Sequence, residues 1–294
     1  MYSCGDQKGI ALVVTLLALV LITAMVVEFS YGVYTGTVNL YNWSDSQRLS
    51  LMARSGIHVS AKMLSDTLSG KPYSYPGSME FPVQNPFEDF EGSISVRLED
   101  ENAKFNLNAI IYRIGDVNPA AFQAFQRLLM ILSLDTKIAD RVREWIDPDE
   151  FAEISGLEEG AKNAAFASVD ELLLVRGISR EDYDKLFPYI TVYGTRDNLE
   201  ININGADAAV LMSLSESLDE GEAKKIMTHR DFSPFENIGQ VNSVATFQTA
   251  SGISLIYKGK IFSIQSSAES GGVKRIIETV FDTEKVRVEY WKEY

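Results

Sequence analysis

The feature that most constrains this chain is an uninterrupted apolar run of 18 residues, 10–27, close to its N-terminus. Thr15 and Thr23 are the only polar members of the run, and Glu28 ends it abruptly. At about 1.5 Å of rise per residue, a helix of this length reaches roughly 27 Å, close to the thickness of the hydrocarbon core of a bilayer. The sequence therefore predicts a single helix that crosses a membrane.

A cleaved secretory signal peptide is the alternative interpretation of the same run. The apolar stretch is long for such a signal, and no small-x-small cleavage site followed by polar sequence comes after it. Apolar residues instead continue at helical spacing, and no proline occurs until Pro72. We therefore expect the membrane helix to continue into a long amphipathic helix. Lys8 is the only basic residue before the run, so charge alone does not fix its orientation.

Composition restricts the classes of function. The chain carries 27 Lys and Arg against 41 Asp and Glu, a formal net charge of −14. Such a charge repels nucleic acid phosphates and anionic lipid headgroups, and it favours cationic partners or metal ions. Cys4 is the single cysteine, so no intrachain disulfide forms. His58 and His229 are the only histidines, and no nucleophile motif or phosphate loop accompanies them, so we expect no enzymatic activity.

Strand signals occur in two separate parts of the remaining chain. Prolines and glycine between positions 72 and 86 predict a loop after the long helix. Two alternating runs, 93–98 and 104–108, follow that loop and predict a β-hairpin. Beyond about position 250 the alternation returns and predicts three strands, at 260–269, 273–282 and 285–291.

Between these two sets of strands the apolar spacing is helical. Residues 138–146 carry one such apolar face. Four residues are placed as helix N-caps: Asn118, Ser168, Asn204 and Asp219. The order helix, strands, helices, strands predicts an α+β fold in which a helical domain is inserted between strands of one sheet.

The segment Lys8-Gly9-Ile10-Ala11-Leu12 resembles the class III signal of type IV pilins and type II secretion pseudopilins. This resemblance implies that a prepilin peptidase cuts between Gly9 and Ile10 and methylates the new N-terminus at Ile10. Pilins usually carry a glutamate as the fifth residue after the cut, where this chain has Val14. The K-type minor pseudopilin of type II secretion is the subfamily that routinely lacks this glutamate.

Five further motifs are similar to those of the K-type family and occur in the family's order. They are Asn106-Leu107-Asn108, Trp145-Ile146-Asp147-Pro148-Asp149, the block 166–178, Ile201-Asn202-Ile203-Asn204 and Tyr290-Trp291. The resemblance implies an α+β fold: a pilin-like long N-terminal helix packed on an antiparallel sheet, with a large helix-hairpin-helix or SAM-like domain inserted between strands. It divides the chain into a leader (1–9), a transmembrane helix (10–27), a pilin-like helix with first strands (28–108), the inserted domain (109–248) and C-terminal strands (249–294).

The resemblance also implies a function. A K-type protein is a minor pseudopilin at the tip of the type II secretion pseudopilus, where it initiates assembly with the I- and J-type minor pseudopilins and supports export of folded proteins across the outer membrane. Prepilin peptidase, the major pseudopilin, the inner-membrane assembly platform, the secretin and the exported substrate are the further partners implied. The chain is then a single-pass protein of the bacterial inner membrane, with its bulk in the periplasm.

An acidic cluster after Trp145 is the candidate metal site. Asp147 and Asp149 supply two carboxylates within reach of one ion, and Glu158 and Glu159 return two more across a loop. K-type pseudopilins are similar here and bind calcium in their helical domain, so the resemblance implies a calcium site. Their pattern continues with paired tyrosines, which residues 160–166 lack. The alternative interpretation is a solvated acidic loop with Asp147 at a helix end.

Two other functions compete with this interpretation. A minor pilin of a type IV pilus system shares the leader but usually lacks so large a helical insertion. A helix-hairpin-helix DNA-binding membrane protein is suggested by the segments near positions 173–178 and 202–230. Residues 109–248, however, hold 24 Asp and Glu against 13 Lys and Arg, a balance of −11 that repels DNA phosphates. We therefore expect no nucleic acid partner.

Overall fold

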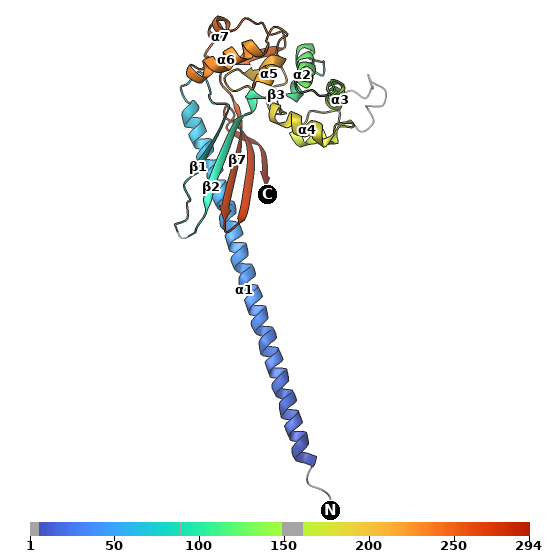
Figure 1. Ribbon diagram of the computed structural model, residues 1–294, viewed down its shortest axis with the longest axis vertical. Helices are drawn as coiled ribbons and strands as arrows, with labels where there is room; N and C mark the ends of the chain where they lie inside the picture. Colours follow the sequence, from blue (N-terminus) through green and yellow to red (C-terminus); the bar gives the residue numbers. More distant parts are fainter. Residues whose placement is uncertain (1–5, 89, 149–160) are drawn as a thin grey trace, which may run out of the picture.

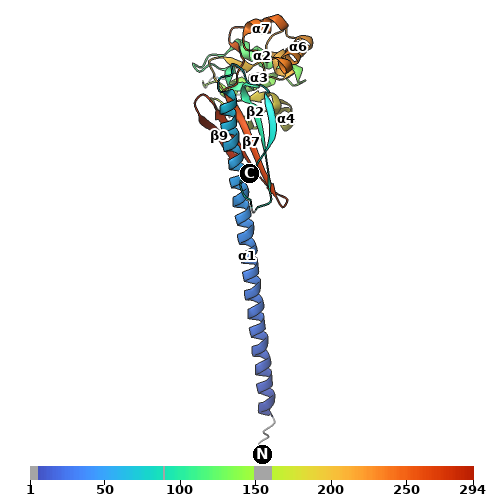
Figure 2. The same ribbon diagram turned by 90° about the vertical axis from the view of Figure 1, so that its left-hand side faces the viewer.

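The computed structural model describes residues 6–88, 90–148 and 161–294. A single helix, α1 (Asp6–Leu68), runs from the N-terminal end to the folded head of the molecule. Its first part projects as a rod with nothing packed against it, and its last part lies along one face of a sheet (Figure 1 and Figure 2). The long N-terminal helix predicted from the sequence is confirmed.

Five antiparallel strands form the sheet, in the order β1-β2-β7-β8-β9. They are β1 (Ser78–Val83), β2 (Ser93–Asp100), β7 (Ile261–Ser270), β8 (Val273–Asp282) and β9 (Arg287–Glu293). Gly271 and Gly272 join β7 to β8 with φ values of 56° and 79°, the left-handed conformation that a two-residue hairpin turn requires. The three C-terminal strands predicted by alternation are confirmed, with small shifts at their ends.

The last part of α1 and the sheet enclose one hydrophobic core. It contains Leu49, Met52, Ala53 and Ile57 from the helix, and Ile94, Val96, Leu98, Ile264, Ala268 and Ile277 from the sheet. Each fully buried aliphatic side chain of this kind contributes roughly 1.5–3 kcal/mol to folding. Gly56 faces the sheet, where a Cβ would overlap Ser266 Oγ. The alternation of the strands therefore sets which face the helix covers.

The predicted hairpin of strands 93–98 and 104–108 is wrong. β2 pairs with β1 on one side and with β7 on the other. The second run contains only the short strand β3 (Phe105–Asn106), which pairs in parallel with β4 (Ile190–Thr191) outside the main sheet. β1 in turn lies within the segment predicted as a loop. It accommodates Pro82 because it is an edge strand, where a missing N–H donor is tolerated.

β2 and β7 are neighbours in the sheet, but residues 101–260 lie between them in the chain. This segment, which we call the lobe, sits at the end of α1 opposite the N-terminus (Figure 1). Its helices are α2 (Pro119–Ile131), α3 (Lys137–Ile146), α4 (Arg180–Leu186), α5 (Ala208–Ser213), α6 (Glu220–Phe232) and α7 (Ile238–Val244), with short 3₁₀ helices η1 (Glu101–Ala103), η2 (Leu107–Ile110), η3 (Val169–Leu174) and η4 (Phe187–Tyr189). A second parallel pair joins β5 (Leu199–Asn202) to β6 (Ile253–Ile256). One hydrophobic cluster forms the core of the lobe.

The four predicted N-caps have different outcomes. Asn118 caps α2 by accepting from the Ala121 N–H at 3.2 Å, and Asp219 caps α6 by accepting from the Glu222 N–H at 2.9 Å. Ser168 precedes the 3₁₀ helix η3 and makes no side-chain cap hydrogen bond. Asn204 opens no helix, because the N-cap of α5 is Asp207. The side chain of Asn204 is used inside the lobe instead.

Candidate functional site

The N-terminal part of α1 has the properties of a membrane anchor. An 18-residue window of this helix has a mean hydropathy of 3.0, and none of that window is buried in the structure. By length and composition the helix can cross a membrane. Thr15 donates its hydroxyl to the Leu12 carbonyl at 2.9 Å, and Thr23 donates to the Leu19 carbonyl at 2.5 Å. Both hydroxyls are therefore satisfied within the helix, as an apolar surrounding requires.

The predicted cleavage site lies in the first turns of this anchor. α1 continues without a break through Gly9 and Ile10. Apart from its chain neighbours and the backbone of its own helix, nothing lies within 4 Å of the position that a Cβ on Gly9 would take, and Ile10 is exposed. Val14, one turn further along, is also exposed and presents an isopropyl group where a carboxylate is expected in most pilins. Cleavage at Gly9 and methylation of Ile10 stay predictions.

The candidate calcium ligands lie only partly within the described residues. Asp147 is half-buried at the C-cap of α3, where its N–H donates to the Arg143 carbonyl at 2.9 Å. Asp149, Glu158 and Glu159 lie outside the described residues. Across residues 6–88, 90–148 and 161–294, no group of three or more His, Cys, Asp or Glu side chains is placed to hold a metal ion. The calcium site therefore stays a prediction.

The first asparagine motif fixes the backbone of the lobe through hydrogen bonds. The Oδ1 of Asn106 accepts from the Asn108 N–H at 3.0 Å. The buried Asn108 side chain then binds Phe166 at both of its backbone groups, accepting from the N–H at 2.8 Å and donating to the carbonyl at 2.9 Å. Its amide also donates to the Val192 carbonyl at 2.8 Å. One side chain thus joins the end of β3 to two distant segments.

The second motif repeats this arrangement at another place in the lobe. The Oδ1 of Asn202 accepts from the Asn204 N–H at 3.1 Å. Asn204 accepts from the Phe235 N–H at 2.8 Å, donates to the Phe235 carbonyl at 2.8 Å and donates to the Tyr257 carbonyl at 2.9 Å. Its side chain is completely buried. The same three kinds of hydrogen bond therefore occur twice.

Aromatic stacking and strand pairing repeat as well. Trp145 stacks on Phe166 with ring centres 6.0 Å apart, and His229 stacks on Phe235 at 4.7 Å. Each asparagine motif also follows one strand of a two-stranded parallel pair, β3 with β4 or β5 with β6. The lobe is thus built from two halves of one design. In the sequence, this repeat is visible as two N-x-N motifs, each with a phenylalanine downstream. Each motif by itself does not indicate that the two are related.

A buried carboxylate joins the lobe to the sheet. Asp100, at the end of β2, accepts from Asn202 Nδ2 at 2.6 Å, from Ser74 Oγ at 3.2 Å and from the Asn102 N–H at 2.9 Å. Burial raises the pKa of Asp100 from 3.8 to about 6, although the hydrogen bonds from these partners act in the opposite direction. Since the pKa is raised in the folded state, this group contributes less to stability as the pH rises through the window between about 4 and 6.

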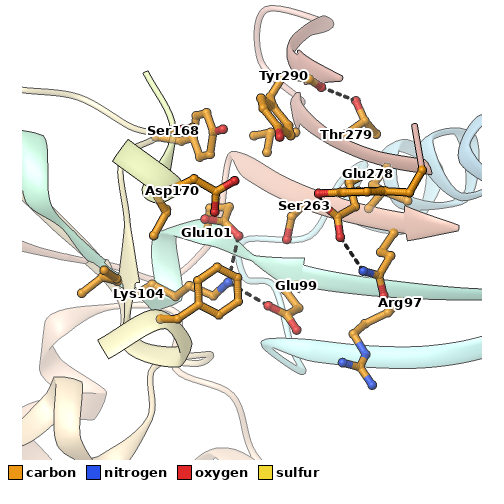
Figure 3. Close-up of a pocket in the computed structure, with 18 of the residues that line it drawn as sticks. Arg97, Glu99, Glu101, Lys104, Ser168, Asp170, Ser263, Glu278, Thr279 and Tyr290 are labelled. Carbon is orange, nitrogen blue, oxygen red and sulfur yellow. Dashed lines mark hydrogen bonds and ion pairs between the residues drawn. The ribbon is translucent and has the colours of Figure 1, made fainter. Parts of the chain in front are cut away.

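A cleft of about 290 Å³ lies between the first half of the lobe and the outer face of the sheet (Figure 3). Lys104 extends across it, with Nζ 2.7 Å from a Glu99 oxygen and 3.0 Å from a Glu101 oxygen. Burial alone would lower the pKa of Lys104, but the carboxylates of Glu101 and Glu99 raise it above its ordinary range. Lys104 is therefore a fixed positive charge that these two carboxylates neutralise.

Comparison with known protein families shows to which family this chain belongs. Two family models, both described as type II secretion system (T2SS), protein K, match residues 103–195 and 201–256. They cover 93 and 56 residues, together 149 of 294, and their boundary falls between the two halves of the lobe. This chain belongs to the protein K family of the type II secretion system. The resemblance drawn from the sequence motifs is confirmed.

Individual relatives in the protein K family agree. A type II secretion system protein K from Pseudomonas aeruginosa is 30% identical over 183 residues, which are 57% of this chain and 54% of that protein. The protein K of Aeromonas hydrophila is 26% identical over an alignment of 313 positions, covering 96% and 94% of the two chains. The chain thus matches about half the length of the first relative and nearly all of the second.

A solved protein K structure shows the same fold. It comes from the crystal structure of the GspK-GspI-GspJ complex of the enterotoxigenic Escherichia coli type 2 secretion system. The similarity has a TM-score of 0.69 at 20% sequence identity, and it covers 87% of this chain and 99% of that one. At this level of identity the comparison supports the fold: a long N-terminal helix, an antiparallel sheet and several helices.

Proposed function

We propose that this protein K is the minor pseudopilin at the tip of a type II secretion pseudopilus, where it initiates assembly and supports export of folded proteins across the outer membrane. The observation that carries the proposal is the position of the lobe. It lies beyond the sheet at the end of α1 opposite the anchor, and it extends sideways from the helix axis (Figure 1). In a filament of parallel helices, this bulk occupies the space that a subunit stacked above would need.

Val14 supports the same position from the other end of the molecule. In the pilin arrangement a carboxylate at this position pairs with the N-terminal amine of a neighbouring subunit. Val14 is exposed on the anchor and offers that amine no partner. A subunit above this one would bury an unpaired ammonium in the membrane, which is strongly unfavourable. The amine of this chain itself still has a glutamate available on a subunit below.

The proposal includes partners and location. The similar solved chain was crystallised with GspI and GspJ, so we infer that I- and J-type minor pseudopilins bind this protein. We further infer that prepilin peptidase processes it and that the major pseudopilin, the assembly platform, the secretin or the exported substrate contacts it. The anchor spans the inner membrane once, residues 109–248 form the inserted domain, and the head lies in the periplasm. The protein acts by binding and assembly, not by turnover.

We expect one copy of this protein for each pseudopilus. Single-molecule fluorescence of a labelled chain, in cells whose major pseudopilin carries a second colour, should show one spot at one filament end. A Val14→Glu variant is the matched control, because it restores the carboxylate without changing the head. Labels distributed along the shaft for the unaltered chain would exclude the tip position. The absence of I- and J-type subunits from complexes that are affinity-purified with the unaltered chain would exclude these partners.

We further propose that calcium binds at Asp147, Asp149, Glu158 and Glu159. Carboxylates so close in sequence repel one another, and a divalent ion turns that repulsion into attraction. Calcium at a hundredfold excess over its Kd should therefore stabilise the protein by about 2.7 kcal/mol, and magnesium by less. Thermal unfolding of the detergent-solubilised chain measures this change.

The matched variants for the calcium test differ only in where charge is removed. Asp147→Ala with Asp149→Ala should abolish the calcium-dependent rise in melting temperature. Asp66→Ala with Asp116→Ala removes the same charge from α1 and from the loop before α2, and should leave the calcium response unchanged. An absent thermal shift, together with no calorimetric heat of calcium binding, would assign the cluster to a solvated loop.

A further inference from the structure

The two walls of the cleft beneath the lobe differ in chemistry. The wall formed by the lobe carries an apolar and aromatic patch, which includes Val169, Tyr183 and Phe187, beside the charged side chains of Glu101, Lys104 and Asp170. The wall formed by the sheet is polar, and it includes Gln265 and Glu278. A volume of about 290 Å³ accommodates one or two side chains but no folded segment. The cleft is therefore suited to a single inserted group with an apolar stem and a polar end.

Asp170 and Glu278 are the carboxylates that line the cleft besides Glu99 and Glu101, which contact Lys104. Arg97 also lines the cleft but pairs with Glu80 at 3.1 Å, and Lys292 lies opposite Glu278 in the β8–β9 register. Asp170, on the lobe, accepts from the Tyr183 hydroxyl at 2.7 Å, and its nearest cation is Lys292 at 3.5 Å on the exposed rim. Glu278, on the sheet, accepts from Gln265 Nε2 at 2.6 Å and from the Tyr294 hydroxyl at 3.1 Å. Within the described part of the chain, no basic group lies at ion-pair distance from Glu278.

Two tyrosines, Tyr193 and Tyr290, line the cleft near its carboxylates. Burial raises the pKa of the Tyr193 hydroxyl, and the negative charges of Glu101 and Asp170 raise it further. The rings of Tyr193 and Tyr290 lie 6.4 Å apart at an interplanar angle of 53°, and both residues line the cleft. Carboxylates and π faces both attract cations, and both disfavour anions.

At the rim of the cleft, one cation already lies beside both a carboxylate and an aromatic ring. Lys292 Nζ is 4.5 Å from the centre of the Tyr294 ring, in addition to its contact with Asp170. The part of the cleft between Asp170 and Glu278 has the same combination of carboxylates and aromatic rings (Figure 3). A planar guanidinium fits it better than an ammonium, since it donates in several directions and stacks on aromatic rings.

We propose that this cleft binds an arginine side chain from a partner protein, with the guanidinium between Asp170 and Glu278 and the aliphatic stem against the apolar patch. This assigns the molecule a cation-binding site for an exposed arginine on a partner's loop. The inference concerns the ligand of the cleft, and it holds whether or not the protein occupies the tip of a pseudopilus.

Protection of a thiol at the rim tests the proposal with a defined probe. Ser168 lines the cleft and makes no side-chain cap hydrogen bond, so Ser168→Cys is a mild change; Cys4→Ser removes the other thiol. The full chain in a neutral detergent is then alkylated with iodoacetamide. N-acetylarginine amide should slow alkylation in a saturable manner, at least threefold at saturation. N-acetylcitrulline amide, which has nearly the same shape but no charge, should not.

Charge variants separate binding in the cleft from a general acidic field. Asp170→Asn with Glu278→Gln keeps the shapes of both side chains. This double variant should raise the concentration of N-acetylarginine amide needed for half-maximal protection about tenfold. Glu181→Gln, on the exposed surface of α4, removes a carboxylate outside the cleft and should change nothing. Equal protection by citrulline, or protection that persists in the double variant, would overturn the proposal. So would the absence of protection in a chain whose thermal unfolding is unchanged.

Discussion

Asn204→Ala should lower the free energy of unfolding of the head by about 3 kcal/mol or more. The substitution removes the partner of the Phe235 N–H and of the Phe235 and Tyr257 carbonyls, all of which Asn204 now binds within 3 Å. Leaving a buried backbone polar group unsatisfied costs about 1–3 kcal/mol for each group. The site is completely buried, so water does not replace the lost amide without rearrangement.

Denaturant unfolding of the detergent-solubilised chain, followed by near-UV circular dichroism, measures this loss. Asn242→Ala is the matched control, because Asn242 is exposed on α7 and its removal should change stability by less than about 0.5 kcal/mol. Asn108→Ala should cost a similar amount to Asn204→Ala, since it makes the same three kinds of hydrogen bond in the other half of the lobe. A small effect at both positions would show that the two motifs are not structural centres.

The elements that sequence reasoning recovered are those with long, uninterrupted periodicity. The anchor is readable because the whole apolar run is exposed, so no tertiary contact modifies its pattern. β7 alternates between buried and less buried side chains from Phe262 to Ala268, and β7 and β8 both pack one face against α1. In such elements, the spacing of apolar side chains along the sequence is enough to indicate the type of element and its buried face.

The wrong predictions concern segments whose structure depends on residues far away in the sequence. Residues 104–108 alternate like a strand, but the partner of Phe105 is Ile190, and the pairing covers two residues only. Asn204 has the residue type of an N-cap, yet its amide is used by Phe235, 31 positions away. Pro82 argued for a loop, because the sequence does not show that β1 is an edge strand.

The cleft could not be read from the sequence for the same reason. Its lining residues come from both halves of the molecule: Asp170 and Tyr183 lie in the lobe, while Glu278 and Tyr290 lie on the last strands of the sheet. No local pattern links these positions. The asparagine repeat was different, since both N-x-N motifs were visible, and comparing the two motifs with each other would have revealed it.

Gly9→Val should abolish processing of the N-terminus while leaving the fold unchanged. The family resemblance places the cut after Gly9, and a peptidase that requires a small residue there should not accept valine. The structure supplies the second half of the argument: α1 is continuous through this position, and nothing besides the chain neighbours and the backbone of the same helix lies within 4 Å of a Cβ at Gly9. The variant chain should therefore accumulate as a precursor that retains residues 1–9, in a membrane-inserted and folded form.

Intact-mass spectrometry and N-terminal sequencing of the purified protein measure this outcome. The unaltered chain should begin at Ile10 and carry one additional methyl group. Gly32→Val is the matched control, because Gly32 lies in the same helix and likewise has nothing else within 4 Å of its Cβ position, so this variant should be cut and methylated normally. A mature N-terminus beyond Glu28 in the unaltered chain would instead identify residues 10–27 as an ordinary signal peptide. The anchor, and with it the assembly of this protein into a pseudopilus, would then be excluded.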